Sequence, residues 1–258
     1  MARRVVFDDP ALGALTRDRL TRDYAVYQRA EGHRFSVDDV ATAWVACNAT
    51  TAPSRILDLG CGLGSVLLHL AWKFPEASLV GIEAQAMSFE LVRRNVTENG
   101  LAGRIALVHG DLREAVVLDA AGGGFDLVTG TPPYFPPDAA TGAEDEQRAF
   151  ARIEYRGGVE AYIEAADRTL APSGRFVLCG ASEADHRVCG AAEKHGFHVI
   201  ARADVVPREG RSSLFAIWTL ARTGAPLART EITIRDRAGQ RTEAARALTR
   251  FSGLVPKE

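Results

Sequence analysis

Two short segments of this chain carry residue types that could do chemistry. The first is a glycine-rich run, Asp58-Leu59-Gly60-Cys61-Gly62-Leu63-Gly64, and the second is Thr131-Pro132-Pro133-Tyr134-Phe135. A glycine-rich turn lets the backbone approach a nucleotide-like cofactor closely. Two consecutive prolines supply no backbone donors and stiffen their turn, and an aromatic ring after them can stack on a flat acceptor. The two segments predict a cofactor site beside a site for an amino group on a planar ring or amide.

Acidic residues at three predicted strand ends indicate which cofactor is bound. The glycine run is a poor match to the dinucleotide fingerprint, because Ser65 stands where the third glycine belongs. Asp58 would repel a pyrophosphate but suits the ammonium and amino-acid end of S-adenosylmethionine. Glu83 could accept hydrogen bonds from both ribose hydroxyls, and Asp111 could accept one from the adenine amino group. We therefore expect S-adenosylmethionine to be bound by Asp58, Gly60, Gly62, Glu83 and Asp111, although any one acid alone could equally be a helix cap.

Strand-like and helix-like segments alternate along the chain, which predicts a parallel sheet with helices on both faces. The expected strands are 54–59, 78–83, 104–109, 125–129, 175–179, 198–206 and 214–221, and the expected helices are 65–74, 86–98, 159–170 and 184–195. Only residues 207–213 separate the last two strands, too few for a parallel crossover, so these strands should form an antiparallel hairpin. The predicted fold is an α/β, Rossmann-like, doubly wound seven-stranded sheet, mostly parallel with an antiparallel last strand.

Three regions are expected within one compact unit. Residues 1–45 form an N-terminal segment that roofs the cofactor site, and residues 46–222 form the α/β domain. Residues 223–258 form a basic extension with a strand pair, 231–235 and 240–242, and a short helix. Between positions 222 and 250 there are seven arginines and three acids. Such a tail can contact phosphates, and a solvated surface is an equal interpretation.

Composition limits the classes of partner. The 258 residues are 47% hydrophobic and 25% charged with a net charge of −2, which is typical of a globular protein without a global field for nucleic acid. No apolar run approaches the roughly 18–20 residues needed to cross a bilayer, and the N-terminus lacks an apolar stretch of signal-peptide length, so we expect no membrane span and a cytoplasmic location. The four cysteines lack metal-ligand spacing, so no metal is expected.

Together these segments resemble the class I S-adenosylmethionine-dependent methyltransferases that carry an Asn/Asp-Pro-Pro-Tyr/Phe signature. Within them the chain is similar to the bacterial tRNA (adenine-N6)-methyltransferases that modify a valine tRNA in its anticodon loop. The resemblance runs from about Tyr27 to Leu220. It is carried by Gly32-His33-Arg34-Phe35-Ser36-Val37-Asp38, Asp58 to Gly64, Gly81-Ile82-Glu83, Asn95, Asn99-Gly100-Leu101, Asp111 and Pro132-Pro133-Tyr134-Phe135. It implies methyl transfer to an exocyclic amino group of a base, most of all adenine N6 in tRNA.

The resemblance also implies cofactor contacts near the N-terminus. In that family the Phe-Ser-x-Asp segment closes over the cofactor, which makes Phe35 and Asp38 candidate contacts. Without the resemblance, Ser36 is a helix N-cap with Asp39 three residues later, and Phe35 is a hydrophobic staple. Both interpretations of Phe35 stay open.

For the acceptor, the resemblance makes Thr131, Pro132, Pro133 and Tyr134 the catalytic turn. Tyr134 and Phe135 would stack on the base, as enzymes that extrude a nucleotide require. The polar stretch 136–146 is expected to be a loop. Arg148, Arg152 and Arg156 stand four residues apart on a predicted helix and could bind substrate from one side of a groove, or simply face solvent.

Thr131 departs from the family pattern. The family has Asn or Asp there, and its side-chain oxygen accepts a hydrogen bond from the amine, whereas the threonine hydroxyl reaches less far. A Ser or Thr before Pro-Pro also resembles some N4-cytosine methyltransferases, so the modified atom stays open.

Three other functions stay open as well. They are a protein glutamine-amide methyltransferase, a small-molecule methyltransferase and a cofactor-binding module without catalysis. The glutamine enzymes usually carry an extra N-terminal helical domain, for which the about 30 residues before Phe35 are too few. RNA is expected rather than DNA, because no separate DNA-reading domain is visible.

Overall fold

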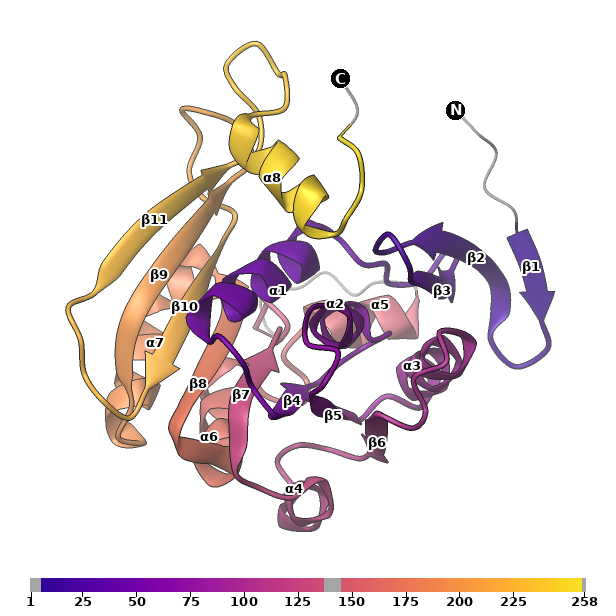
Figure 1. Cartoon of the computed structure of the whole chain (residues 1–258), viewed down its shortest axis with the longest axis horizontal. Coiled ribbons are helices and arrows are strands. Elements are labelled where there is room, and N and C mark those ends of the chain that lie inside the picture. Colours follow the sequence, from indigo (N-terminus) through magenta and orange to yellow (C-terminus); the bar gives the residue numbers. More distant parts are fainter. Residues whose placement is uncertain (1–5, 137–144, 257–258) are drawn as a thin grey trace.

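The computed structural model describes residues 6–136 and 145–256, so most of the predicted 136–146 loop lies outside the described residues. An eight-stranded sheet crosses the molecule (Figure 1). Its strands, in spatial order, are β11 (Ala228–Thr233), β9 (His198–Val206), β10 (Phe215–Ala221), β8 (Leu170–Ala181), β7 (Phe125–Gly130), β4 (Arg55–Leu59), β5 (Ser78–Glu83) and β6 (Ile105–His109). Neighbours are parallel except β10, which runs antiparallel to both β8 and β9. The predicted α/β fold and its terminal hairpin are confirmed.

The eighth strand comes from the C-terminal extension. The predicted pairing of 231–235 with 240–242 is confined to its inner end, where an antiparallel bridge joins Arg235 to Arg241 and the Thr242 amide donates a hydrogen bond to the Ile234 carbonyl. The residues before this bridge, in β11, instead pair in parallel with β9. Without β11, strand β9 would present its unpaired backbone groups at the sheet edge, and β11 satisfies them. The short helix predicted after it is α8 (Glu243–Phe251).

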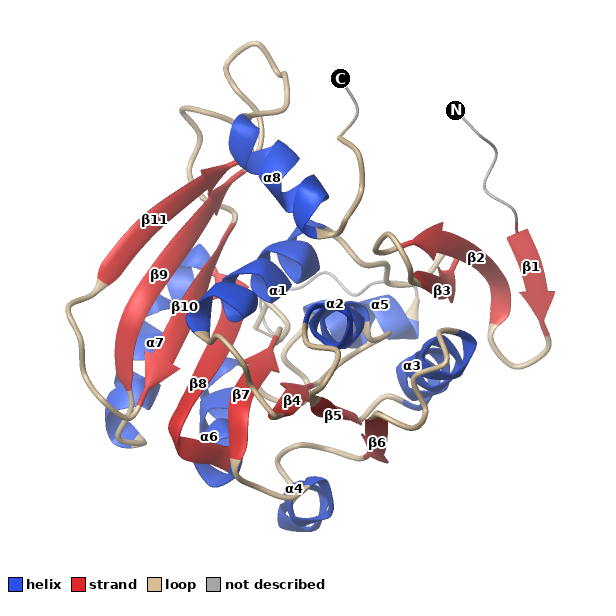
Figure 2. Cartoon of the chain, in the orientation of Figure 1, coloured by secondary structure: helices blue, strands red, loops and turns tan. Residues whose placement is uncertain are grey.

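Helices cover both faces of the sheet (Figure 2). One face packs against α1 (Val37–Ala49), α2 (Ser65–Lys73) and α3 (Ala86–Glu98), with α8 beside α1. The other face packs against α4 (Ala115–Ala121), α6 (Val159–Thr169) and α7 (Asp185–Lys194), which follows the short 3-10 turn Ser182–Ala184. The strands alternate their apolar side chains between these two cores, as a sheet buried on both faces requires.

A second, three-stranded antiparallel sheet precedes the main one and was not predicted. It consists of β1 (Val6–Asp9), β2 (Gly13–Arg19) and β3 (Ala25–Arg29). Two asparagines of α3 hold it. The Asn95 side chain exchanges hydrogen bonds with both backbone groups of Tyr27, and the Asn99 side chain does the same with Ala25. The segment after β3 is thereby placed against the carboxyl edge of the main sheet.

In the described part of the chain, none of the helices has the length and apolar character to cross a bilayer. Across the same residues, no three His, Cys, Asp or Glu side chains are grouped so that they could hold a metal ion.

Candidate functional site

A cavity, here called the donor pocket, opens at the carboxyl ends of β4, β5 and β6. Such strand ends are where ligands bind in open α/β sheets. Residues from the glycine turn, from the segments that follow β5, β6 and β7, and from the N-terminal segment meet here. They are His33, Asp39, Gly60, Cys61, Gly62, Leu63, Ser65, Ile82, Glu83, Ala84, Gln85, Ser88, Gly110, Asp111, Leu112, Thr131, Pro133, Phe150, Ala151, Arg156, Gly157 and Tyr162.

The glycine turn adopts a backbone conformation that would be strained for any residue other than glycine. Gly60 and Gly62 have φ angles of 60° and 57°, in the left-handed region. A Cβ on Gly60 would lie 2.1 Å from the Tyr162 hydroxyl, whereas a Cβ on Gly62 would have no atom within 4 Å. Gly60 is therefore required for packing beneath the turn, and Gly62 leaves its side of the turn open.

Glu83 ends β5 and lines the donor pocket beside this turn. Its Oε2 accepts a hydrogen bond of 2.8 Å from the Gly62 amide, and its Oε1 accepts one of 2.7 Å from the Gln85 amide. Burial raises the pKa of Glu83, and these two backbone donors oppose that rise. Each carboxylate oxygen keeps a lone pair, so the group can still accept from two ligand hydroxyls.

Asp111, two residues beyond β6, also lines the donor pocket. Its carboxylate accepts from the Arg113 guanidinium at 2.7 Å and 3.0 Å. Burial acts to raise the pKa of Asp111, but the hydrogen bonds from Arg113 outweigh it and the net shift is downward.

Asp58 lies beneath the glycine turn, outside the lining of the donor pocket. Its Oδ1 accepts a hydrogen bond of 2.7 Å from the Thr129 hydroxyl. Its buried Oδ2 has no hydrogen-bond partner among the described residues. Burial raises the pKa of Asp58 to about 7. The sequence analysis predicted that this carboxylate contacts the cofactor directly. In the structure it is buried beneath the residues that line the cavity.

A second cavity, here called the acceptor pocket, adjoins the first. It is lined by Gly32, His33, Arg34, Ser36, Asp38, Asp39, Thr131, Pro132, Tyr134, Phe135, Arg148, Ala151 and Arg152. Four residues line both cavities: His33, Asp39, Thr131 and Ala151. Thr131 therefore stands at the junction of the two pockets, with Pro133 on the donor side and Tyr134 on the acceptor side.

Tyr134 is held from two directions. Its hydroxyl donates a hydrogen bond of 3.0 Å to Asp38 and lies 3.1 Å from the Cys179 sulfur. Its ring stacks on Phe215 with centroids 6.4 Å apart. Burial, with Cys179 and Asp38 adding to it, raises the pKa of Tyr134 well above its usual value, so the hydroxyl keeps its proton. Phe135, the next residue, is half exposed at the rim.

Some residues of the Phe-Ser-x-Asp segment pack against the core, and others line a cavity. Phe35 packs against the hydrophobic core and lines neither pocket. Asp38 lines the acceptor pocket only. Its neighbour Asp39 lines both, and its carboxylate accepts from the Ser65 hydroxyl at 2.7 Å and from the Ser36 amide at 2.8 Å. Burial, with Asp38 beside it, raises the pKa of Asp39.

The sequence analysis predicted Arg148, Arg152 and Arg156 on one helix, but only the first two lie on it. Helix α5 spans Glu146–Arg152, so Arg156 follows the helix. Arg148 and Arg152 line the acceptor pocket, and the Arg148 guanidinium also donates to the Glu31 carbonyl at 2.6 Å. Arg156 lines the donor pocket and lies over the Phe150 ring.

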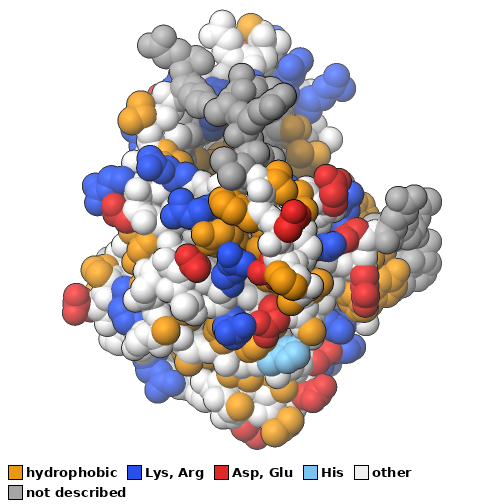
Figure 3. Space-filling view, turned by 90° about the vertical axis from the view of Figure 1, so that its right-hand side faces the viewer, with side chains coloured by type: hydrophobic (Ala, Val, Ile, Leu, Met, Phe, Trp, Pro, Cys, Tyr) orange, Lys and Arg blue, Asp and Glu red, His pale blue; other side chains and the backbone are white. Residues whose placement is uncertain are grey.

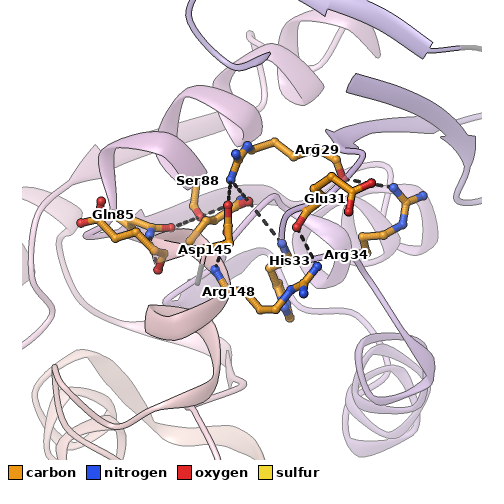
Figure 4. A network of polar contacts seen from close by, with 10 residues as sticks. Arg29, Glu31, His33, Arg34, Gln85, Ser88, Asp145 and Arg148 are labelled. Atoms are coloured by element: carbon orange, nitrogen blue, oxygen red, sulfur yellow. Dashed lines mark hydrogen bonds and ion pairs between the residues drawn. The ribbon is translucent and has the colours of Figure 1, made fainter. Parts of the chain in front are cut away.

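A network of polar contacts holds helix α5 against the N-terminal segment and α3 (Figure 4). Its N-cap Asp145 forms an ion pair of 2.6 Å with Arg29 at the end of β3. The buried side chain of Gln147 donates to the Ser88 hydroxyl at 3.3 Å and accepts from the His33 amide at 3.3 Å. These contacts join α5 to the N-terminal segment and to α3.

Comparison with known proteins agrees with the architecture. The family described as "Methyltransferase domain" matches residues 56–153. A predicted O-methyltransferase from Agrobacterium tumefaciens superposes with a TM-score of 0.63 at 19% identity, covering 86% of this chain and 99% of that one. Residues 56–153 therefore match a methyltransferase domain, and the chain shares the fold of that O-methyltransferase.

The curated relatives that this chain resembles include two kinds of enzyme. A tRNA1(Val) (adenine(37)-N6)-methyltransferase of Porphyromonas gingivalis is 34% identical over 53% of this chain and 53% of the relative. One from Pectobacterium carotovorum is 25% identical over 81% and 82%. A release factor glutamine methyltransferase of Chlorobaculum tepidum is 35% identical over 61% of this chain and 53% of the relative. The chain thus spans about half the length of the relatives with the higher identities.

The match to a methyltransferase domain implies S-adenosylmethionine as the methyl donor, and the donor pocket fits it. Two carboxylates, Glu83 and Asp111, and the carboxyl group of Asp39 line the cavity, with Asp58 beneath the turn. A cationic ligand suits this donor set and a pyrophosphate does not. The two lone pairs left on Glu83 match a pair of vicinal hydroxyls.

The structure also places residues in the two pockets that the sequence interpretation did not assign. His33 belongs to a quoted motif but received no role, and Asp39 was assigned only as part of a capping box. Tyr162 and Phe150 are far from both motifs in sequence and carry no local signal. Burial lowers the pKa of His33, so the ring that lines both pockets is neutral at pH 7.

Proposed function

We propose that this protein is an S-adenosylmethionine-dependent N-methyltransferase that methylates an exocyclic amino group of a nucleic-acid base, with adenine N6 in tRNA as the acceptor. The observation that carries the proposal is the shared wall of the two pockets. Thr131, with the stiff Pro132-Pro133 turn behind it, lies where the donor pocket meets a second cavity that has an aromatic ring in its lining.

On the donor side, we propose that Glu83 binds the ribose hydroxyls and Asp111 binds the adenine amino group. Gly60 and Gly62 allow the close approach of the ligand to the turn. Bound here, the cofactor supplies an electrophilic methyl group on a sulfonium. Asp58 acts from beneath. A cation bound above it would favour the ionised form of its carboxyl group, and the negative charge would then attract that cation.

On the acceptor side, the turn is proposed to hold the amine. The Thr131 hydroxyl accepts one amine N–H, and the Tyr134 ring faces the plane of the base. Phe135, half exposed at the rim, offers a second stacking surface. With its N–H bonds held, the nitrogen directs its lone pair toward the donor pocket. The nitrogen would then take the methyl group, the electron pair of the broken carbon–sulfur bond would stay on sulfur, and the nitrogen would lose one proton to water.

This reaction depends on positioning rather than on a chemical group of the enzyme. His33 is neutral, and Asp39 has a raised pKa. Both line the junction, where they offer hydrogen-bond acceptors to the amine without placing a fixed positive charge beside the methyl group. Arg148 and Arg152 at the acceptor rim are proposed to contact substrate phosphates.

The relatives support tRNA as the substrate. Two of the relatives described above are named as tRNA1(Val) (adenine(37)-N6)-methyltransferases. A cytoplasmic location follows for an enzyme that modifies tRNA. The alternative is transfer to a glutamine amide of a protein, since a release factor glutamine methyltransferase reaches similar identity. An amide is also planar and would fit the same turn.

The test is incubation of the purified protein with methyl-labelled S-adenosylmethionine and, separately, the RNA, DNA and protein fractions of a strain lacking the gene. We expect label in the RNA fraction. Digestion to nucleosides then separates N6-methyladenosine from N4-methylcytidine. Tyr134→Ala protein serves as the inactive control. Label confined to a protein fraction, in methylated glutamine, would replace the proposal with the alternative.

A further inference from the structure

The carboxyl edge of the sheet continues past the acceptor pocket. The pairing register sets Phe215 opposite both Ala181 and Val205, and sets Val206 opposite Thr233. The start of β10 and the ends of β9 and β11 therefore lie on the same edge as the acceptor turn that follows β7. The loops 207–214 and 234–242 leave the sheet at this edge, beyond the tips of β9 and β11 and next to α8 (Figure 1).

Packing contacts connect the acceptor pocket to these loops. The Tyr134 ring stacks on Phe215, and Leu214 just before it is 59% exposed. From Leu214 the first loop runs back to Arg208. The Glu209 amide donates a hydrogen bond of 2.8 Å to the Arg235 carbonyl in the second loop. The two loops thus form one continuous surface that begins beside the acceptor pocket.

This surface is basic. We call segments 207–213 and 235–241 the arginine surface, since they contain five arginines (208, 211, 235, 237 and 241) and two acids (Glu209 and Asp236). Arg208 and Arg211 are exposed and take part in none of the ion pairs found among residues 6–136 and 145–256. Arg237 pairs with Glu209, but both side chains are at least half exposed, and such pairs contribute little.

The local charge differs from that of the molecule as a whole. The complete chain has a net charge of −2. On the face shown in Figure 3, acidic and basic side chains are intermixed. The arginine surface therefore presents uncompensated guanidinium groups on an otherwise balanced protein. Their planar donors match phosphate oxygens in geometry and charge.

We propose that the arginine surface binds backbone phosphates of the RNA whose target base enters the acceptor pocket. This inference rests on the proposed function. Two, three and four inter-strand steps of about 4.8 Å separate β7 from β10, β9 and β11, so the surface extends from about 10 Å to about 19 Å along the edge from the acceptor turn. Nucleotides stacked at about 3.4 Å each cover that distance in about three to six residues. The contacted phosphates would therefore lie about three to six nucleotides from the target base.

The experiment measures binding of an unmodified valine tRNA transcript over a salt series, with S-adenosylhomocysteine present. It compares wild type with the R208A/R211A double variant. Each phosphate contact contributes about 0.7 to 0.9 to the slope of log affinity against log salt. The double variant should lose about 1.4 to 1.8 from that slope and bind more weakly at low salt. Its affinity for S-adenosylhomocysteine should not change.

The matched control is R93A/R168A, which also removes two exposed arginines. Arg93 lies on α3, and Arg168 lies near the end of α6, which leads into β8 at the opposite edge of the sheet. The control should keep the wild-type slope. Thermal unfolding of both variants checks that each remains folded.

The outcomes separate this inference from the proposed function. Methylation of tRNA by wild type together with an unchanged slope in R208A/R211A would overturn the inference alone. Failure of wild type to bind the transcript while it binds S-adenosylhomocysteine would overturn both the RNA substrate and the inference. Tighter binding of poly-glutamate than of the transcript, lost in the double variant, would assign the arginine surface to an acidic protein and likewise overturn it.

Discussion

The hydroxyl of Tyr134 donates a hydrogen bond of 3.0 Å to Asp38, which ties the acceptor turn to the first turn of α1. The Tyr134 side chain therefore has two roles. The hydroxyl holds the turn in place, and the residue also lines the acceptor pocket, where we propose that its ring stacks on the base.

Substitutions at Tyr134 should therefore separate the structural role of its hydroxyl from the proposed stacking role of its ring. We expect Tyr134→Ala to lower kcat at least about 100-fold, because a stacking contact of about 1–3 kcal/mol and the position of the turn are both lost. Tyr134→Phe keeps the ring and should lose less than about tenfold, the value of one hydrogen bond. Both should bind S-adenosylhomocysteine as wild type does in calorimetry. Equal loss of cofactor affinity and activity in Tyr134→Ala would contradict this division.

Glu83 should control cofactor affinity. Its carboxylate holds the Gly62 amide and is proposed to accept both ribose hydroxyls, and hydrogen bonds to a charged group contribute about 1.5–3 kcal/mol each. Glu83→Ala should weaken S-adenosylhomocysteine binding about 100-fold or more, and Glu83→Gln, which keeps one acceptor oxygen, should weaken it less. The exposed Glu76 at the opposite edge supplies the control, Glu76→Ala. Unchanged affinity in Glu83→Ala would remove the proposed ribose contact.

Asp58 should make stability depend on pH. Its folded pKa of about 7 lies above the usual value of 3.8, so the folded state favours the protonated form. The contribution to stability is full below about pH 4 and is lost as the pH rises to 7. Within this window wild type should lose about 1.4 kcal/mol of unfolding free energy per pH unit relative to Asp58→Asn. Urea unfolding of both proteins without cofactor at several pH values measures the difference, and a constant difference would show that the pKa is not raised.

The ion pair between Arg29 and Asp145 should hold α5 over the donor pocket. Arg29→Met removes the charge and leaves Asp145 as the helix cap alone. We expect a several-fold weaker affinity for S-adenosylhomocysteine, because Phe150 and Ala151 of α5 line the pocket. Arg19→Met, an exposed arginine of the same small sheet, should have no effect. Full affinity in Arg29→Met would mean that Gln147 and its partners suffice to hold the helix.

The main sheet was predictable because its signals are local and strong. The strands Ser78–Glu83 and His198–Val206 and the helix Ala86–Glu98 match the prediction at both ends. Their apolar runs are bounded by turn residues such as Asn99-Gly100. The small sheet β1–β3 was missed because its strands are stabilised by Asn95 and Asn99 of α3, contacts that no local pattern reveals. Helix α4 has only seven residues, too short for a periodic signal.

The site could be predicted to the level of segments but not of side chains. Asp38 and Asp39 are adjacent in sequence, yet successive residues of a helix point about 100° apart, so only Asp39 lines both pockets. Asp58 was expected to reach the cofactor, and the structure buries it against Thr129. Which side of a turn a carboxylate occupies depends on packing between elements far apart in the sequence.

The central claim is methyl transfer to adenine N6 at the junction marked by Thr131. The most direct measurement is mass spectrometry of nucleosides from an unmodified valine tRNA transcript after incubation with S-adenosylmethionine and the purified protein. The account predicts N6-methyladenosine with wild type and at least tenfold less with Thr131→Ala, whose S-adenosylhomocysteine affinity should be unchanged. Absence of any methylated adenosine, with a methylated glutamine formed instead on a protein substrate, would contradict it.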